Sequence, residues 1–262
     1  MKMLLDGKKV RNQILVDIKT RIQKEKINAF LAIISVGDNP ASEIYIRNKI
    51  KACEEVGIEA RHFSLKSNAS EETVQELIEK LNKDPKITGI ILQSPLPKHL
   101  DFDACVNKIK STKDVDGLTK ENIYNLYMKK DALIPCTVKG ILRLLEAYKI
   151  PISGKHAIII GRGNIVGHPL SLALTNMDAT VTLAHSKTNN LKRLCQEADI
   201  IIACAGSPGL IKADMVKENA IVIDVGVTRK EGKIIGDVCF ESIAQKASYI
   251  TPNPRGVGPM TV

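Results

Sequence analysis

The 262-residue sequence contains no tryptophan, and aromatic residues make up only 3% of it. Proteins that bind single-stranded nucleic acids use aromatic side chains as stacking platforms, and few are available here. The net charge of +9 comes from lysines interspersed with acidic residues along the chain, without a basic arm. We therefore expect a solvated, lysine-rich surface that favours anionic small molecules, with a non-catalytic nucleic-acid-binding protein as the alternative.

Long hydrophobic runs are also missing. No apolar run approaches the roughly 20 residues that a membrane span needs, and the apolar stretch near the N-terminus is too short for a signal peptide. The six cysteines form no CxxC pair, and the five histidines form no HExxH motif or paired cluster. These absences predict a cytoplasmic protein with reduced thiols, no membrane partner and no metal site.

Strand-like and helix-like segments alternate through the chain, which is typical of α/β proteins. A first series precedes a loop region, and a second series begins after residue 150. We therefore predict two α/β domains, residues 1–137 and 138–262, and a loop for the final segment "TPNPRGVGPMTV". In the first series the predicted strands are 30–37, 59–65 and 87–93, and the predicted helices are 42–57 and 70–82.

The segment "IIIGRGNIVGHP" (158–169) carries glycines between a predicted strand and a predicted helix. Gly161, Gly163 and Gly167 allow a tight turn and let the backbone approach a pyrophosphate at the helix N-terminus. Their G-x-G-x-x-x-G spacing is one residue longer than the usual dinucleotide fingerprint, and a purely structural turn is the alternative. The flanking strand and helix favour a Rossmann-type cofactor site.

The strand that follows this helix bears on the choice of cofactor. It ends "LAHSKT", with His185, Ser186 and Lys187 and without the carboxylate that usually accepts the ribose 2′-hydroxyl of NAD. Cations and hydroxyls suit a 2′-phosphate, and Arg162 in the glycine loop adds another cation. These residues favour NADP, unless the charged side chains are merely solvated.

Tyr45 and Lys49 lie four residues apart in a predicted helix, and so on one helix face. The spacing fits the Y-x-x-x-K pair of short-chain dehydrogenases, but here it precedes the glycine loop by more than a hundred residues, and the chain order excludes that class. A solvated tyrosine and lysine are the simple alternative. Gln93 at a strand end, with Asp114 and Asp116 in the loop "KDVDG", supplies polar groups that could converge with them in a cleft.

Taken together, these motifs resemble a known family. The chain is similar over nearly its whole length to the bifunctional methylenetetrahydrofolate dehydrogenase/cyclohydrolases of the bacterial FolD type. The resemblance implies that 5,10-methylene-tetrahydrofolate is oxidised with NADP and that the methenyl product is hydrolysed to 10-formyl-tetrahydrofolate. The matching segments, in order, are "YIRNKIKACEEVGI", "GIILQSPLP", "KDVDGLT", "PCTVKGI", "GRGNIVGHP", "ATVTLAHSKT", "AIVIDVG" and "YITPNPRGVGPMTV".

The same resemblance implies residue roles. Lys49 is implied as the catalytic lysine, Tyr45 as the residue that packs on the folate ring, Gln93 as the residue that holds the lysine, and Asp116 as the carboxylate that binds the pterin amino group. Residues 1–137 would be the folate-binding catalytic domain and 138–262 the NADP-binding domain, with an active-site cleft between them. Further contacts are implied at Gly161, Arg162, Gly163, Ser186 and Val227 for NADP, and at Pro254, Gly256, Gly258 and Pro259 for folate.

The resemblance also implies a homodimer. A divergent member that retains only one activity is the alternative, because several positions depart from the family pattern: Ser94, Val138, Gly163, Asn253 and Arg255 stand where leucine, proline, serine, valine and glycine are usual. An arginine at position 255 would cost about 1–2 kcal/mol if φ is positive there, and it would place a new cation near the folate or nicotinamide. Family members usually continue with a further C-terminal helix, which is missing after residue 262 of this sequence; either the terminus is cropped or disordered, or the chain lacks that helix.

Overall fold

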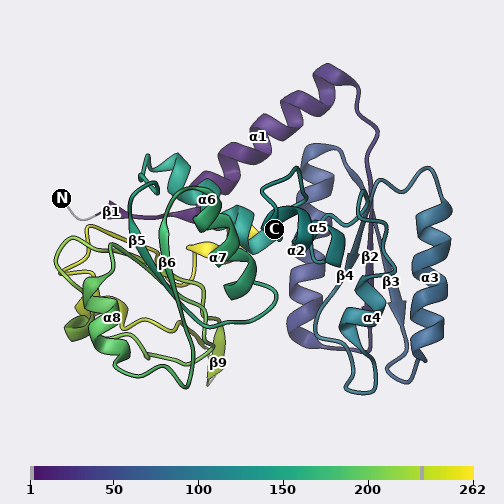
Figure 1. Cartoon of the computed structure of the whole chain (residues 1–262). Helices are drawn as coiled ribbons and strands as arrows, with labels where there is room; N and C mark the ends of the chain where they lie inside the picture. The colour runs from purple at the N-terminus through teal and green to yellow at the C-terminus, as the bar shows by residue number, and fades with distance from the viewer. Residues whose placement is uncertain (1–2, 231–232) are drawn as a thin grey trace. The chain divides into compact units, whose positions relative to one another are not determined.

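A computed structural model describes residues 3–230 and 233–262 (Figure 1). By their internal contacts, the residues divide into two compact units. We call Asn12–Cys136, with Val262, the three-stranded unit, and Met1–Arg11 with Thr137–Thr261 the six-stranded unit. Helix α1 (Gly7–Glu25) contains the division after Arg11. In the described part of the chain, no helix combines the length and apolar character that a membrane crossing requires.

The three-stranded unit is a parallel sheet in the order β3-β2-β4, with α2 and α3 on opposite faces (Figure 1). Alternation along β2 explains the two faces, because successive side chains of a strand point to opposite sides. Ile34 packs with Ile78 of α3, whereas Ile33 packs with Ile46 of α2. The elements are β2 (Phe30–Val36), α2 (Pro40–Val56), β3 (Glu59–Leu65), α3 (Glu71–Lys83), β4 (Gly89–Leu92), α4 (Phe102–Val106) and α5 (Lys120–Tyr127).

Sequence signals account for the limits of α3. Ser70 is the N-cap residue, and its hydroxyl accepts a hydrogen bond from the backbone N–H of Thr73 at 3.2 Å. At the other end, the Lys113 ammonium donates to the carbonyls of Leu81, Asn82 and Asp84 at 3.2, 3.0 and 2.7 Å. A cation at a helix C-terminus satisfies carbonyls that lack an intrahelical partner.

The six-stranded unit has the sheet order β1-β11-β8-β7-β5-β6, and every pair in it is parallel. Its buried strands β5, β7 and β8 are continuous apolar runs, as a sheet covered on both faces demands. Its elements are β1 (Met3–Leu4), α6 (Cys136–Ala147), β5 (His156–Ile160), α7 (Gly167–Asn176), β6 (Thr180–Ala184), α8 (Leu191–Glu197), β7 (Ile200–Ala203), η1 (Ala213–Met215), β8 (Ile221–Asp224), β9 (Thr228–Lys230), β10 (Lys233–Ile235), α9 (Phe240–Ile243), β11 (Tyr249–Ile250) and α10 (Val257–Thr261).

Two sequence expectations differ from these elements. The predicted first domain began at residue 1, whereas β1 pairs with β11 and residues up to Arg11 cluster with the six-stranded unit. A strand of two residues has no periodicity from which its sheet could be predicted. The final segment was expected to be a loop, but it contains the short helix α10, in which Pro259 occupies the third position. Proline is tolerated in a first helical turn because those N–H groups have no intrahelical acceptor.

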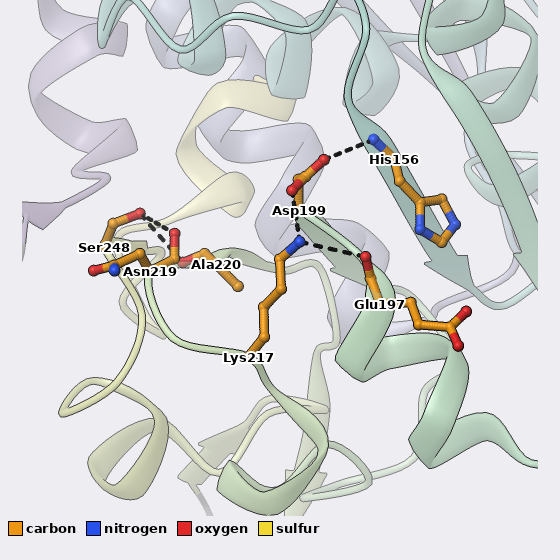
Figure 2. Close-up of polar contacts among 7 residues, drawn as sticks. All are labelled: His156, Glu197, Asp199, Lys217, Asn219, Ala220 and Ser248. Carbon is orange, nitrogen blue, oxygen red and sulfur yellow. Dashed lines mark hydrogen bonds and ion pairs between the residues drawn. The ribbon is translucent and has the colours of Figure 1, made fainter.

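An ion pair joins segments at the amino ends of the six-stranded sheet (Figure 2). The Asp199 carboxylate binds the Lys217 ammonium at 2.6 Å and accepts the backbone N–H of His156, at the start of β5, at 2.9 Å. Lys217 also donates to the carbonyl of Glu197 at 3.3 Å, at the end of α8. The hydrogen bond from Lys217, followed by that from His156, lowers the pKa of Asp199. This network lies at the amino ends of the strands, whereas the glycine loop follows the carboxyl end of β5.

Candidate active site

Lys49 is a buried lysine on α2, with 8% of its surface exposed. Its ammonium donates a hydrogen bond to the Gln93 side-chain oxygen at 3.3 Å. Among the described residues it has no ion-pair partner, so its contact is with a neutral amide. Lysine is rarely buried unless it is paired, because an ammonium loses its hydration there. Burial beside a neutral acceptor therefore marks this amine as chemically unusual.

Gln93 follows β4 directly and is held at both ends of its amide. Its nitrogen donates to the Ser94 carbonyl at 2.8 Å, which directs its oxygen toward Lys49. The same Ser94 carbonyl accepts a 3.3 Å hydrogen bond from the hydroxyl of Ser42, which is 6% exposed and lies on α2. Ser42 was not among the site residues predicted from the sequence. Its signal would have been a serine seven residues before Lys49, two turns along the same helix.

Tyr45 lies one turn before Lys49 on α2 and is half-buried. Its hydroxyl has no hydrogen-bond partner among the residues that the structure describes. The ring is therefore available to contact a flat ligand while its hydroxyl remains free. The simple alternative of a fully solvated tyrosine and lysine is wrong, because Lys49 is buried and Tyr45 is partly covered.

The two aspartates of the "KDVDG" loop have different surroundings. Asp114 is fully buried, and its carboxylate accepts the backbone N–H of Thr119 at 2.7 Å and the amide of Asn122 at 3.0 Å. These bonds hold the loop to the start of α5. Asp116 is half-buried, and its carboxylate has no hydrogen-bond partner among the described residues. Asp114 thus anchors the loop through one oxygen, while its other buried oxygen has no hydrogen-bond partner among the described residues, and the half-buried Asp116 keeps its acceptors for a ligand.

The glycine loop fits a dinucleotide. Gly161 directly follows β5 and has φ at +122°, a conformation that side chains rarely permit. A Cβ atom on Gly167 would lie 2.0 Å from the Gly161 carbonyl oxygen. No atom lies within 4 Å of a Cβ atom built on Gly163. The backbone therefore turns tightly into α7 and is open at Gly163, as a pyrophosphate at a helix N-terminus requires.

The turn after β6 presents donors. Ser186 and Lys187 are exposed, and the turn is closed by a 2.8 Å hydrogen bond from the backbone N–H of His185 to the Thr188 hydroxyl. No carboxylate is present in residues 185–188, and Arg162 is exposed in the glycine loop. The predicted donors for a 2′-phosphate are therefore accessible. On the turn after β8, Val227 is 48% exposed.

The C-terminal loop is tied to two parts of the six-stranded unit. The amide of Asn253 donates to the Gly226 carbonyl at 2.9 Å, and the guanidinium of Arg255 forms an ion pair with Asp6. Arg255 has φ at +89°, and this positive φ is the condition under which the sequence predicted backbone strain at position 255. The charge of Arg255 is paired with Asp6, and its placement near a bound ligand stays a prediction.

The four predicted folate-side residues of this loop differ in exposure. Gly256 is buried, and its carbonyl oxygen would lie 1.9 Å from a Cβ atom on Gly7, so the loop packs against the start of α1. Pro254 is exposed, and Gly258 and Pro259 are half-buried. This loop belongs to the six-stranded unit, whereas Lys49 belongs to the three-stranded unit.

Comparison with known protein families gives matches to both parts of the chain. Residues 5–116 match the catalytic domain of tetrahydrofolate dehydrogenase/cyclohydrolase, and residues 135–262 match its NAD(P)-binding domain. The chain belongs to the tetrahydrofolate dehydrogenase/cyclohydrolase family. The resemblance drawn from the sequence motifs is therefore confirmed, and so is the α/β fold with parallel sheets.

Members of this family resemble the chain over almost its full length. The bifunctional protein FolD of Moorella thermoacetica is 48% identical, covering 99% of this chain and 94% of the relative. The crystal structure of the bifunctional FolD dehydrogenase/cyclohydrolase from Campylobacter jejuni matches with a TM-score of 0.97 and 45% identity, covering 100% of this chain and 94% of that one. The Trypanosoma brucei enzyme, solved with NADP and an inhibitor, matches with a TM-score of 0.94 and 34% identity, covering 99% and 93%.

Proposed function

We propose that Lys49 transfers the protons in the second of two reactions that this chain catalyses on one folate. The chain is an NADP-dependent methylenetetrahydrofolate dehydrogenase and methenyltetrahydrofolate cyclohydrolase, as a member of its family. The observation that supports the role of Lys49 is its burial against the neutral amide of Gln93, without a counter-ion among the described residues.

The first reaction removes a hydride from the methylene bridge of 5,10-methylene-tetrahydrofolate and leaves the methenyl cation. NADP, when bound, supplies the hydride acceptor. The Trypanosoma brucei relative was solved with NADP, and the accessible Ser186 and Lys187 turn without a carboxylate supports the same choice here. We propose Gly161, Arg162, Gly163 and Ser186 for the phosphates, and Val227 for the nicotinamide side. For the protein, this step is mainly a matter of positioning.

The second reaction adds water to the methenyl carbon. The water must lose a proton as its oxygen bonds to carbon, and the ring nitrogen N5 must gain one as its bond to that carbon breaks. The products are 10-formyl-tetrahydrofolate and one released proton. A neutral Lys49 amine can accept the first proton and return it to N5. General acid–base catalysis of this kind contributes about 100- to 10,000-fold.

The other residues of the three-stranded unit have positioning roles in this proposal. Gln93 holds the Lys49 amine through a neutral hydrogen bond that stabilises the ammonium less than a carboxylate would. The half-buried Tyr45 ring contacts the flat folate ring, and the Asp116 carboxylate, which has no hydrogen-bond partner among the described residues, accepts donors of the pterin amino group. Pro254, Gly256, Gly258 and Pro259 are proposed as folate contacts on the basis of the family resemblance.

The domain roles and the cellular setting are also proposals. From the sequence, residues 1–137 were predicted to bind folate and residues 138–262 to bind NADP. We propose the folate role for the three-stranded unit and the NADP role for the six-stranded unit, which also includes the residues up to Arg11. Six free cysteines support a reducing cytoplasmic compartment. A homodimer is proposed from the resemblance alone, and sedimentation of the purified chain would test it.

A direct assay tests the function. The purified chain is mixed with 5,10-methylene-tetrahydrofolate and either NADP or NAD, and both reduced nicotinamide and methenyl absorbance are followed. We expect faster reduction of NADP than of NAD, with methenyl absorbance that rises and then decays as hydrolysis proceeds. Methenyl absorbance that accumulates and persists would show that only the dehydrogenase is present. Absence of reduced cofactor would contradict the dehydrogenase assignment.

A further inference from the structure

The carboxyl ends of β5 and β7 form the point at which the strand order of the six-stranded sheet reverses. The chain passes from β5 to its neighbour β6 on one side and returns to β7 on the other side of β5. In open α/β sheets, ligands bind in the crevice outside the carboxyl ends of the strands at such a point. The glycine loop follows β5 there, and a second turn, Cys204–Gly206, follows β7.

These two turns are in direct contact. A Cβ atom on Gly161 would lie 2.4 Å from the carbonyl oxygen of Cys204, so the backbones approach too closely for a side chain. The Cys204 thiol donates a 3.5 Å hydrogen bond to the Gly161 carbonyl. Burial, with a smaller contribution from Asp237, raises the pKa of Cys204 to about 12 and keeps this thiol protonated. The position of one turn therefore constrains the other.

Asp237 holds the second turn from outside the sheet. It lies between β10 and α9 and is fully buried. One carboxylate oxygen accepts the backbone N–H groups of Ala205 and Gly206 at 2.7 and 2.9 Å. The other oxygen has no hydrogen-bond partner among the described residues and lies against Gly226, where a Cβ atom would approach it to 2.4 Å. Burying a carboxylate with a free oxygen is unfavourable for stability, so the buried position of Asp237 needs an explanation other than stability.

Asp224 fixes Asp237 in turn. Its carboxylate, at the end of β8, accepts the backbone N–H groups of Asp237 at 2.9 Å and Gly226 at 3.0 Å. Its own N–H is bound to the hydroxyl of Thr251 at 2.7 Å. Two buried carboxylates thus connect the turn that leads to Val227 with the turn beside the glycine loop. The two turns follow adjacent strands of the sheet.

We propose that Asp237 is a positioning residue of the dehydrogenase, which holds the Ala205–Gly206 turn against the glycine loop so that the dinucleotide site is formed before NADP binds. This inference rests on the proposed function, because it takes NADP as the ligand of the switch-point crevice. Asp237 is buried, and it acts on the cofactor site only through its hydrogen bonds to the backbone N–H groups of Ala205 and Gly206. Asp237 is not among the proposed cofactor contacts, which include Gly161, Ser186 and Val227.

The test compares Asp237→Ala and Asp237→Asn with the parent chain. The alanine variant loses both hydrogen bonds to the turn, whereas asparagine keeps a neutral acceptor and weaker bonds. Asp214→Ala is the matched control, because Asp214 is an exposed carboxylate of the same unit, paired with Lys192. The dissociation constant of NADP is measured by calorimetry without folate, and the cyclohydrolase rate is measured on supplied methenyl substrate, which needs no hydride acceptor.

We expect Asp237→Ala to weaken NADP binding by about tenfold or more and Asp237→Asn by a smaller factor, with the cyclohydrolase rate unchanged in both. Asp214→Ala should bind NADP like the parent. If alanine does not yield folded protein, judged by circular dichroism, the asparagine variant decides the question. NADP binding at parental strength in the folded variants would overturn the proposal, and so would an equal loss of NADP binding and cyclohydrolase rate. A parent that binds NADP but catalyses neither reaction would contradict the proposed function, while the binding comparison would still decide the role of Asp237.

Discussion

The ammonium of Lys49 and the side-chain oxygen of Gln93 form a 3.3 Å hydrogen bond that joins helix α2 to the end of strand β4. Because a second bond from the Gln93 nitrogen to the Ser94 carbonyl fixes the amide, its oxygen rather than its nitrogen faces the lysine. The arrangement gives Lys49 an acceptor without giving it a counter-charge. The chemistry proposed for this amine depends on that difference.

Replacing Gln93 by glutamate tests this relationship. A carboxylate in place of the amide would form an ion pair with Lys49 instead of a neutral hydrogen bond, and we expect the cyclohydrolase rate to fall by about tenfold or more. Gln23→Glu, an exposed change on α1, is the control for added charge. A cyclohydrolase rate that is the same in Gln93→Glu and the parent would contradict the positioning role.

Asp116→Asn tests the folate-binding carboxylate. A charge-assisted hydrogen bond to the pterin amino group would be weakened, so we expect KM for the folate to rise about tenfold in both reactions. Asp131→Asn, a change at an exposed aspartate of the same unit, should leave KM unchanged. Steady-state kinetics with each folate substrate provides the measurement. A lower kcat with an unchanged KM would instead indicate a role in chemistry and contradict the assignment.

The positive φ of Arg255 predicts an order of stability among variants. Arg255→Gly removes the backbone strain, although glycine is more flexible in the unfolded chain, whereas Arg255→Ala keeps the strain and loses the ion pair with Asp6. We expect the glycine variant to exceed the alanine variant by about 1 kcal/mol in free energy of unfolding. The parent should lie close to the glycine variant, because an exposed ion pair contributes about 0–1 kcal/mol. Urea unfolding of the three proteins measures this, and an alanine variant as stable as glycine would refute the strain.

The Asp199–Lys217 ion pair predicts a pH dependence of stability. The pKa of Asp199 is lower in the folded chain than its ordinary value, so its stabilising contribution is complete above pH 4 and is lost as the pH falls through the folded pKa. Lys217→Met should reduce the free energy of unfolding at pH 7 by up to about 1 kcal/mol, since the pair is one-third exposed and partly screened. The difference from the parent should shrink below pH 4.

Lys192→Met is the matched control for this prediction, because the Lys192–Asp214 pair has the same 2.6 Å separation but is more exposed. Its effect should be smaller at every pH. Thermal or urea unfolding between pH 3 and 7 supplies the data. A Lys217→Met variant whose deficit stays constant, or grows, as the pH falls would contradict the role given to Asp199.

Local sequence signals were sufficient where one strand or helix determines the outcome. The apolar runs of β2 and β5 predicted strands, and the segment 70–82 predicted the helix α3. The glycine pattern around Gly161 predicted a turn that the structure shows with positive φ. These features depend on side-chain periodicity and backbone conformation, which are properties of a short segment.

Long-range contacts could not be predicted in the same way. The pairing of β1 with β11 depends on residues more than two hundred positions apart. Asp237, in the segment "IIGDVCF", resembles any polar residue after a strand until the structure shows the backbone groups of Ala205 and Gly206 bound to it. Likewise, the loop "KDVDG" by itself offers both Asp114 and Asp116, and the family resemblance selects Asp116; the structure adds that Asp114 is buried and Asp116 only half-buried.

The most direct test of the account is the hydrolysis of supplied 5,10-methenyl-tetrahydrofolate by Lys49→Met, with Lys51→Met as the control on an exposed position of the same helix. We predict that Lys49→Met loses the hydrolysis, with a rate lower by about 100-fold or more, and that methenyl product accumulates when it oxidises the methylene substrate. Lys51→Met should hydrolyse at the parental rate. Opening of the methenyl ring by folded Lys49→Met at the parental rate would contradict the central claim.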